Sequence, residues 1–327
     1  MNGDGFMTVQ IPFGRKYLEL RAPSDAEILE SGIGKLKAAT GEDQLVMAAM
    51  ENPIGSLSLK ELAQGRKTCT LIISDHTRPV PSRRILPHML RELREGNPDI
   101  EITLLVATGF HRFSTPEELR NKLGDEIYTR ERIVIHDSRD PESNVEIGVL
   151  PSGARCVVDK LAAETDLLVA EGFIEPHFFA GFSGGRKSVL PGICDQVTVL
   201  GNHCARFIAS PRARTGILDG NPIHEDMLAA SRLAKLRYIV NVIIDDDKKV
   251  TAAFAGDPEQ AHLAGCQMLL DYCRVSPKRK GNIVISSNGG YPLDQNVYQS
   301  VKGLTAAEAA AAKEAVLIMV SACSDGA

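Results

Sequence analysis

Three histidines of this chain lie where an imidazole could do acid–base or metal chemistry. His111 and His177 each follow an apolar, β-branched run, and His203 comes shortly after a glycine-rich loop. Two imidazoles near one substrate can form an acid–base pair at neutral pH. Their spacing matches no zinc motif, so side chains alone would not supply most ligands of a metal. We interpret the other histidines considered as structural residues: His88, His136, His224 and His262.

The glycine-rich loop is a candidate phosphate site. Gly184 and Gly185 allow a ligand to approach the backbone closely, and Arg186, Lys187 and Ser188 could hold a phosphate. The motif GxxxxGK[ST] needs a glycine where this chain has Arg186, so an ordinary nucleoside triphosphatase is disfavoured. A flexible surface turn is the alternative interpretation.

A second polar loop contains Asp75 and Arg78, three residues apart and bounded by prolines. Arg78 could bind a carboxylate or phosphate through two parallel bonds, and Asp75 could hold a ribose or orient that arginine. A plain surface ion pair explains the same residues equally well. In a later helical segment Tyr298 and Lys302 share a face, and Lys302 by itself reads as a solvated lysine.

The elements that must position these side chains alternate between strand and helix. This alternation predicts an α/β fold with mostly parallel sheets and a site at the carboxyl ends of the strands. The apolar runs predict strands at 68–74, 102–108, 133–136, 166–170, 238–244, 282–287 and 315–322. The helical patterns are 81–96, 115–123, 223–235, 258–273 and a helix-rich segment within 294–314.

A polar, basic stretch at 276–281 predicts a boundary between two domains. The first, residues 1–275, would be an N-terminal α/β domain that carries the cofactor site. The second, residues 276–327, would be the start of a C-terminal α/β domain. It holds one strand–helix–strand unit, which buries too little to fold alone, so we expect it to be incomplete or to lean on the first.

Composition excludes several classes of protein. The 327 residues are 43% hydrophobic and 24% charged, which excludes disordered and low-complexity chains. The net charge of −5 disfavours nucleic-acid binding through a basic face. The seven cysteines are scattered, with no CxxC pair, so neither a disulfide framework nor a cysteine zinc site is expected. With no leader or membrane-spanning run predicted, we expect a cytoplasmic protein.

Taken together, these segments resemble the nickel-dependent lactate racemase family. The matching stretches occur in the same order along most of the chain, and the long central one is the most specific. They are SDHTRPVP (74–81), GFHR (109–112), GFIEPHFFAGFSGGRKSVLPG (172–192), GNH (201–203) and GGYPLDQNVYQSVKG (289–303).

The resemblance implies a cofactor and a role for each candidate residue. The cofactor would be a nickel pincer nucleotide, the Ni(II)-pyridinium-3,5-bisthiocarboxylate mononucleotide, linked covalently to Lys187, with His203 as the protein's ligand to nickel. His111 and His177 would be the paired acid and base. The nucleotide would contact Asp75, His76, Thr77 and Arg78. The substrate would contact Tyr298, Gln299 and Lys302.

The expected reaction is the racemisation or epimerisation of a 2-hydroxy acid, lactate or a related short acid, by reversible hydride transfer. The resemblance places the active site in a cleft between the two domains, with the second domain shortened. It implies cofactor-maturation enzymes as partners, and it leaves the substrate side chain and the oligomeric state open. The alternatives are a nucleotide- or phosphate-binding hydrolase or transferase, and a non-catalytic homologue that binds the cofactor.

Overall fold

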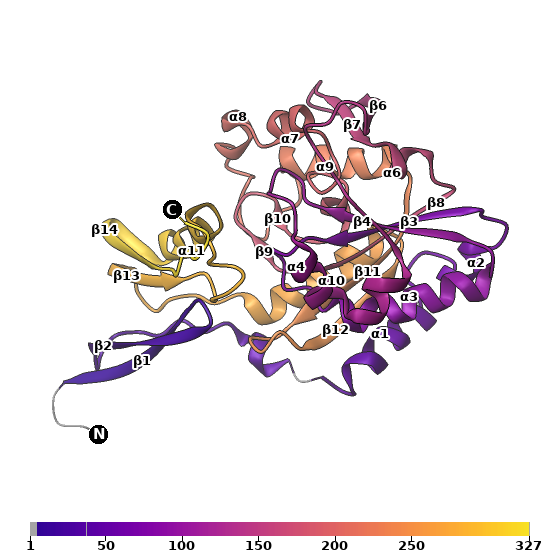
Figure 1. The fold of residues 1–327 in the computed structure, drawn as a ribbon. Helices are drawn as coiled ribbons and strands as arrows, with labels where there is room; N and C mark the ends of the chain where they lie inside the picture. Colours follow the sequence, from indigo (N-terminus) through magenta and orange to yellow (C-terminus); the bar gives the residue numbers. More distant parts are fainter. Residues whose placement is uncertain (1–4, 37, 327) are drawn as a thin grey trace. The chain divides into compact units, whose positions relative to one another are not determined.

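The computed structural model describes residues 5–36 and 38–326, which form two compact units (Figure 1). Unit 2 holds Val80–Asp271 and the described residues between Gly34 and His76. Unit 1 holds the described residues up to Ile33, the short segment Thr77–Pro79, and the described residues from Tyr272 onward. The domain boundary expected at residues 275–276 stays a prediction.

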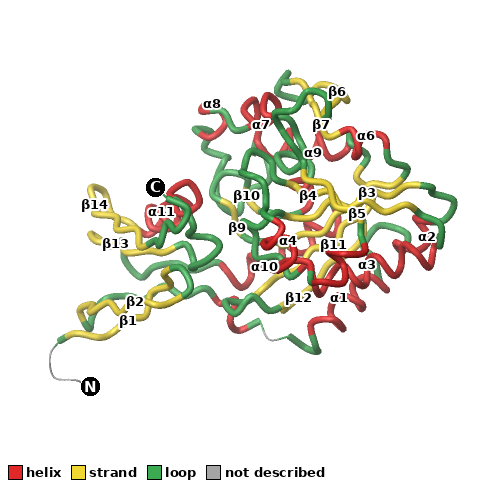
Figure 2. Tube along the Cα trace, viewed as in Figure 1, coloured by secondary structure: helices red, strands yellow, loops and turns green. Residues whose placement is uncertain are grey.

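Unit 2 is built on a six-stranded sheet, drawn with its strands in yellow and the helices in red in Figure 2. Every neighbouring pair is parallel except β11 with β12, which are antiparallel. The expected mostly parallel α/β fold is therefore confirmed. In spatial order the strands are β12 (Val250–Gly256), β11 (Leu236–Ile244), β8 (Leu167–Phe173), β3 (Thr68–Ser74), β4 (Glu101–Ala107) and β5 (Arg132–Ile135).

Apolar side chains fix the helices of unit 2 against this sheet. In α3 the fully buried Ile85, Met89 and Leu93 recur every four residues and so lie along one face of the helix. They join the central cluster that includes Leu71 and Ile73 of β3. Burying each such side chain stabilises the fold by about 1.5–3 kcal/mol.

The helices of unit 2 connect the strands of the sheet. They are α1 (Glu42–Glu51), α2 (Leu59–Ala63), α3 (Ser82–Gly96), α4 (Pro116–Leu123), α5 (Asp125–Arg130), α6 (Lys160–Glu164), α7 (Gln196–Asn202), α8 (Ala205–Ile208), α9 (Pro222–Leu233) and α10 (Gln260–Cys273), whose last turn enters unit 1. The sequence predicted α3, α4, α9 and α10, whereas the ten-residue α1 and the shorter α2, α5, α6, α7 and α8 were not predicted.

The order of the strands reverses between β3 and β8. From β3 the chain moves outward to β4 and β5, and from β8 it moves the other way to β11 and β12. Loops that leave the carboxyl ends of β3 and β8 therefore diverge, which is where open α/β sheets bind ligands.

Smaller elements complete unit 2. The strands β6 (Asn144–Val149) and β7 (Arg155–Asp159) form an antiparallel ribbon. After β8 comes the short pair β9 (Pro176–His177) and β10 (Gly181–Phe182), followed by the 3-10 turn η2 (Gly185–Ser188). None of these was predicted from the sequence.

Unit 1 combines both ends of the described chain. A parallel pair, β13 (Gly281–Ser287) and β14 (Ala311–Val320), is joined by α11 (Val297–Ala310), which confirms the expected strand–helix–strand unit. An antiparallel hairpin of β1 (Phe6–Phe13) and β2 (Lys16–Pro23) belongs to the same unit and was not predicted. Another short 3-10 turn, η1 (Gly32–Lys35), lies at the change of unit.

One buried carboxylate ties the hairpin to the later segments of unit 1. Oδ2 of Asp294, which is fully buried, accepts the backbone N–H of Gly14 at 2.8 Å and that of Ala322 at 3.1 Å. In addition, the N–H of Tyr291 donates to the carbonyl of Gly14 at 2.9 Å. The hairpin is thus bonded to segments almost three hundred residues later in the chain.

Candidate active site

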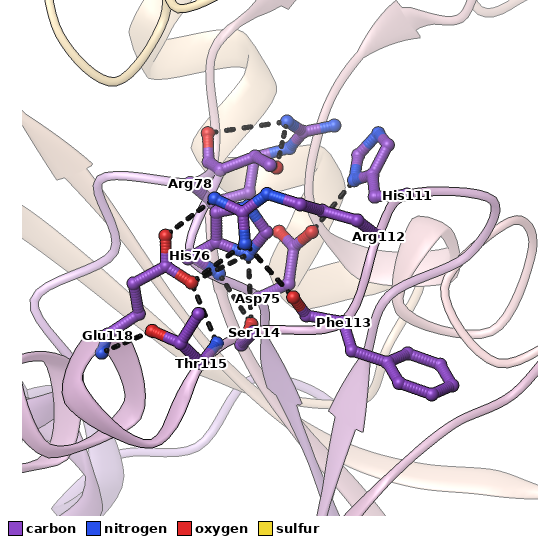
Figure 3. A network of polar contacts seen from close by, with 10 residues as sticks. Asp75, His76, Arg78, His111, Arg112, Phe113, Ser114, Thr115 and Glu118 are labelled. Atoms are coloured by element: carbon purple, nitrogen blue, oxygen red, sulfur yellow. Dashed lines mark hydrogen bonds and ion pairs between the residues drawn. The ribbon is translucent and has the colours of Figure 1, made fainter. Parts of the chain in front are cut away.

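A histidine–aspartate contact joins the loops after β3 and β4. His111 Nδ1 lies 2.7 Å from Oδ2 of Asp75, which is buried (Figure 3). Because a carboxylate can only accept, Nδ1–H is the donor, and the lone pair of the neutral imidazole is then on Nε2. The contact fixes His111 in the tautomer that accepts a proton at Nε2.

His76 is held inside the same loop region by the start of α4. Its backbone N–H and its Nδ1 both meet Ser114 Oγ, at 3.3 Å and 2.9 Å. Burial lowers the pKa of His76. Nearby Arg112 binds Glu118 through two bonds of 2.7 Å and 2.9 Å, which lowers the pKa of that carboxyl to about 2 (Figure 3). A neutral His76 therefore sits beside a strong surface ion pair.

The remaining nucleotide and substrate candidates belong to unit 1. Arg78 Nη1 donates to Thr77 Oγ1 at 2.8 Å. On α11, Gln299 is buried, and its backbone N–H donates to the side chain of Asn296, the helix cap. Tyr298 is exposed and Lys302 is half-buried. Their predicted contacts with a nucleotide or a substrate stay predictions.

Phe179 brings three candidate residues of unit 2 together. Its ring centroid lies 4.6 Å from that of His177 and 4.9 Å from that of His203, both in edge contacts. Lys187 Nζ lies 5.7 Å from the same centroid. The amine and the two imidazoles therefore surround one aromatic side chain, although they come from separate segments of the chain.

His203 has the properties of a metal ligand. Burial, followed by the charge of Lys187, lowers its pKa to about 3, so the imidazole is neutral at physiological pH. Its Nδ1 is buried and has no hydrogen-bond partner among the described residues. Those residues also hold no group of three or more His, Cys, Asp or Glu side chains able to bind an ion. The role of His203 as a metal ligand stays a prediction.

His177 is held in the tautomer opposite to that of His111. Its Nδ1 accepts the backbone N–H of Ala180 at 3.3 Å, so the proton of the neutral ring lies on Nε2. The ring also stacks on Phe178, with centroids 5.0 Å apart. His177 therefore presents an N–H group, and His111 presents a lone pair.

Two side chains of the glycine-rich loop bond to the loop itself. The side chain of Arg186 is almost completely buried, and its guanidinium donates to carbonyls of its own loop. Ser188 Oγ donates to the carbonyl of Gly185 at 2.6 Å. Both side chains thus bond to the loop that carries them, and a role as phosphate ligands stays a prediction.

Glu171 near the end of β8 had no role in the sequence prediction. Its Oε1 accepts the backbone N–H and the hydroxyl of Ser74, each at 3.3 Å, and the hydroxyl of Ser82 at 2.7 Å. Burial raises the pKa of this carboxyl. Ser74 precedes the Asp75–Pro81 loop and Ser82 follows it, so one side chain holds both ends. The sequence feature that could have indicated this role is a single carboxylate within an otherwise apolar strand.

Comparison with known proteins decides the family. The family model described as lactate racemase N-terminal domain matches residues 13–216, and the lactate racemase C-terminal domain matches residues 276–327. The chain is 51% identical over 320 residues to lactate racemase of Thermoanaerobacterium thermosaccharolyticum, covering 97% of this chain and 75% of the relative. The chain belongs to the lactate racemase family. That confirms the resemblance seen in the sequence and makes this an enzyme of the isomerase class.

Further members and structures agree with this family. Lactate racemase of Lactiplantibacillus plantarum is 55% identical over 304 residues, covering 91% of this chain and 72% of the relative. The structure of the lactate racemase apoprotein from T. thermosaccharolyticum superposes with a TM-score of 0.91 at 50% identity, covering 98% of this chain and 75% of that one. A Thermotoga maritima protein matches with a TM-score of 0.61 at 24% identity, covering 73% and 64%, and shows the fold alone.

The described residues include no helix with the length and apolarity that a membrane span requires.

Proposed function

We propose that this chain racemises lactate or a related short 2-hydroxy acid, using a nickel pincer nucleotide carried on Lys187. Relatives that are about half identical to it bear the name lactate racemase. The observation that carries the cofactor assignment is the placement of Lys187 and His203 on the ring of Phe179. A covalent tether and a metal ligand are both needed within reach of one bound group.

The residues present fit such a group. Lys187 offers a primary amine for the covalent link, and neutral His203 offers a buried ring nitrogen that has no hydrogen-bond partner among the described residues. The loop containing Asp75, His76, Thr77 and Arg78 would contact the nucleotide. When bound, the cofactor supplies an electron-poor ring that accepts a hydride from the substrate and returns it.

If the substrate loses a hydride, the chain's own residues need to move only one proton. Removing a proton from the carbon beside a carboxylate would place a second negative charge next to the first, whereas loss of hydride leaves a neutral ketone carbon. The protein must then move only the hydroxyl proton. His111 is prepared for this at Nε2, and Asp75 stabilises the imidazolium that forms.

Two histidines are needed because the enantiomers place their hydroxyl groups differently. One imidazole takes the hydroxyl proton from the first enantiomer, and the other, as an imidazolium, gives a proton to the ketone oxygen as the second enantiomer forms. In their neutral forms His111 presents a lone pair at Nε2 and His177 an N–H. His177 would donate its proton once its Nδ1 is protonated as well. In the reverse direction their roles exchange.

The residues proposed to bind the substrate are Tyr298, Gln299 and Lys302, with Arg78 as a further cation. A carboxylate needs a cationic or strongly donating partner, which Lys302 or Arg78 would provide. A site in a cleft between the two domains and partnership with cofactor-maturation enzymes are part of the same proposal.

The test is co-expression with cofactor-maturation enzymes, followed by intact mass, nickel analysis and chiral chromatography of single-enantiomer acids. We expect a mass adduct that K187A abolishes, nickel that H203A reduces, and racemisation that needs both His111 and His177.

A chain without adduct and nickel would contradict the cofactor assignment. Adduct without racemisation of any 2-hydroxy acid would identify a cofactor carrier, and magnesium-dependent nucleotide turnover without nickel would identify the hydrolase alternative.

A further inference from the structure

Arg186 is a buried cation that bonds to the loop around it. Its side chain is 1% exposed. Nη2 donates to the carbonyl of Ala180 at 2.7 Å, and Nη1 donates to those of Phe182 at 2.9 Å and Gly184 at 3.2 Å. These three carbonyls belong to alternate residues of the segment between His177 and Lys187. One guanidinium therefore spans the whole segment.

Two histidines complete the surroundings of this guanidinium. Its Nε donates to His224 Nδ1 at 3.0 Å. Nη1 lies 3.1 Å from His262 Nε2, which is also 2.8 Å from the carbonyl of Ser183, and that nitrogen can make one of these bonds at a time. Burial, followed by the charge of Arg186, lowers the pKa of both histidines, that of His224 to about 4. Both rings are thus neutral acceptors or donors, not competing cations.

The sheet also holds the segment between His177 and Lys187 in place. The backbone N–H of Gly185 donates to Asn241 Oδ1 at 2.7 Å, and Asn241 lies in the middle of β11. Lys187 follows directly after Arg186 and lies on Phe179, as His177 does. The side chain of Arg186 thus connects the backbone that carries His177 to the backbone that carries Lys187.

We propose that Arg186 is a positioning residue, which sets where Lys187 and His177 lie relative to Phe179. Arginine suits this role because its planar group presents five donors in a fixed fork, whereas lysine presents its donors from a single nitrogen. The proposal gives a reason for the arginine at position 186, where the phosphate-loop motif GxxxxGK[ST] has a glycine. Its importance for catalysis rests on the proposed function, but the placement of Lys187 can be measured without the cofactor.

The experiment measures Lys187 in the chain without cofactor. Brief labelling with an amine-reactive acetylating reagent across a range of pH, followed by peptide mass spectrometry, gives the rate for Lys187 relative to exposed Lys249. R186K keeps the charge and loses the fork. We expect it to change the Lys187-to-Lys249 ratio by about fivefold, the population change expected from losing one buried hydrogen bond.

A milder pair of variants covers the case in which R186K fails to fold. H224L removes the acceptor for Nε and keeps an apolar side chain, whereas H224Q keeps an acceptor. We expect H224L to change the labelling ratio in the same direction as R186K, and H224Q to return it close to that of the unmodified chain. This rescue by an acceptor separates positioning from packing.

V240A serves as the matched control, because Val240 is a fully buried residue of β11 that makes none of these side-chain bonds. We expect it to lower the melting temperature and to leave the labelling ratio unchanged. An unchanged ratio in the folded variants, or an equal change in V240A, would overturn the proposal. Normal labelling together with no cofactor adduct would instead count against the proposed function alone.

Discussion

Asp75 and His111 are 36 residues apart in the chain, yet Asp75 Oδ2 and His111 Nδ1 lie 2.7 Å from each other. The parallel pairing of β3 with β4 brings them together, because the two residues follow the carboxyl ends of adjacent strands. A buried carboxylate so close to an imidazole fixes its tautomer and stabilises its protonated form. In the proposed acid–base role of His111, Asp75 would be the residue that positions the imidazole.

The first prediction concerns this contact. D75N keeps the size of the side chain but lets an amide N–H face His111, which favours the tautomer with its lone pair on Nδ1. We expect racemisation by the loaded enzyme to fall by about 10²–10⁴-fold. Chiral chromatography from each enantiomer measures the rate. D125N, at an exposed aspartate, should leave it unchanged, and equal activity of D75N and the unmodified chain would refute the assignment.

The second prediction is a loss of stability in acid. The folded-state pKa of His203 is about 3 and that of His224 about 4, both below the ordinary 6.5. The folded state therefore binds fewer protons than the unfolded chain. The stability that these histidines support is complete above pH 6.5 and is lost as the pH falls toward 3–4, because the unfolded chain then binds protons that the folded state does not.

Urea unfolding at a series of pH values checks this dependence. H203Q removes one titrating group, so the curve of unfolding free energy against pH should be flatter for H203Q between pH 6.5 and 4. A curve of unaltered slope would show that His203 does not titrate with the stated shift.

The third prediction concerns the backbone at the glycine-rich loop. Gly185 has a φ of +54°, and a Cβ there would lie 2.7 Å from Cγ of the His262 ring. Gly65 has a φ of +72° with open space around it. Both G185A and G65A carry the cost of a left-handed backbone, about 1–2 kcal/mol. We expect G185A to cost about 1–3 kcal/mol more because of the clash. Chemical denaturation compares them, and equal losses would contradict the packing described.

The fourth prediction concerns Glu171. E171Q keeps an oxygen that accepts from Ser74 and Ser82, whereas E171L leaves their donors unpaired. We expect E171L to lower the free energy of unfolding by about 1–3 kcal/mol, and E171Q to change it less. Because burial raises the pKa of this carboxyl, its contribution is largest below pH 4.5 and is lost as the pH rises; E171Q should remove that dependence. Unfolding titrations at two pH values distinguish the variants.

The sequence predicted the structure best where an apolar run is followed directly by polar residues. The run Thr68–Ser74 predicted β3 with its bounds, and the polar residues after it proved to face those after β4. Asp257 directly precedes the helix predicted at 258–273, and its carboxylate accepts the N–H groups of Glu259 and Gln260. Local chemistry is sufficient for such features, because the partners are close in sequence.

Features that depend on distant partners could not be predicted in the same way. The role of Arg186 needs His224 and His262, which lie 38 and 76 residues later. The strand β12, at the edge of the sheet, was not predicted, because the charged turn before it hides its apolar pattern. The hairpin β1–β2 is different, because its sequence carries a local signal in the alternating side chains around Gly14.

The bonds of Asp294 to Gly14 and Ala322 have a practical consequence for anyone dividing this protein into pieces. A fragment that starts after the hairpin would take from the buried Asp294 the N–H of Gly14, and a peptide made only from the last fifty residues would lack the same hairpin. Expression of the smaller unit therefore calls for a chimera, in which the opening residues are spliced to the closing ones through a short artificial connection.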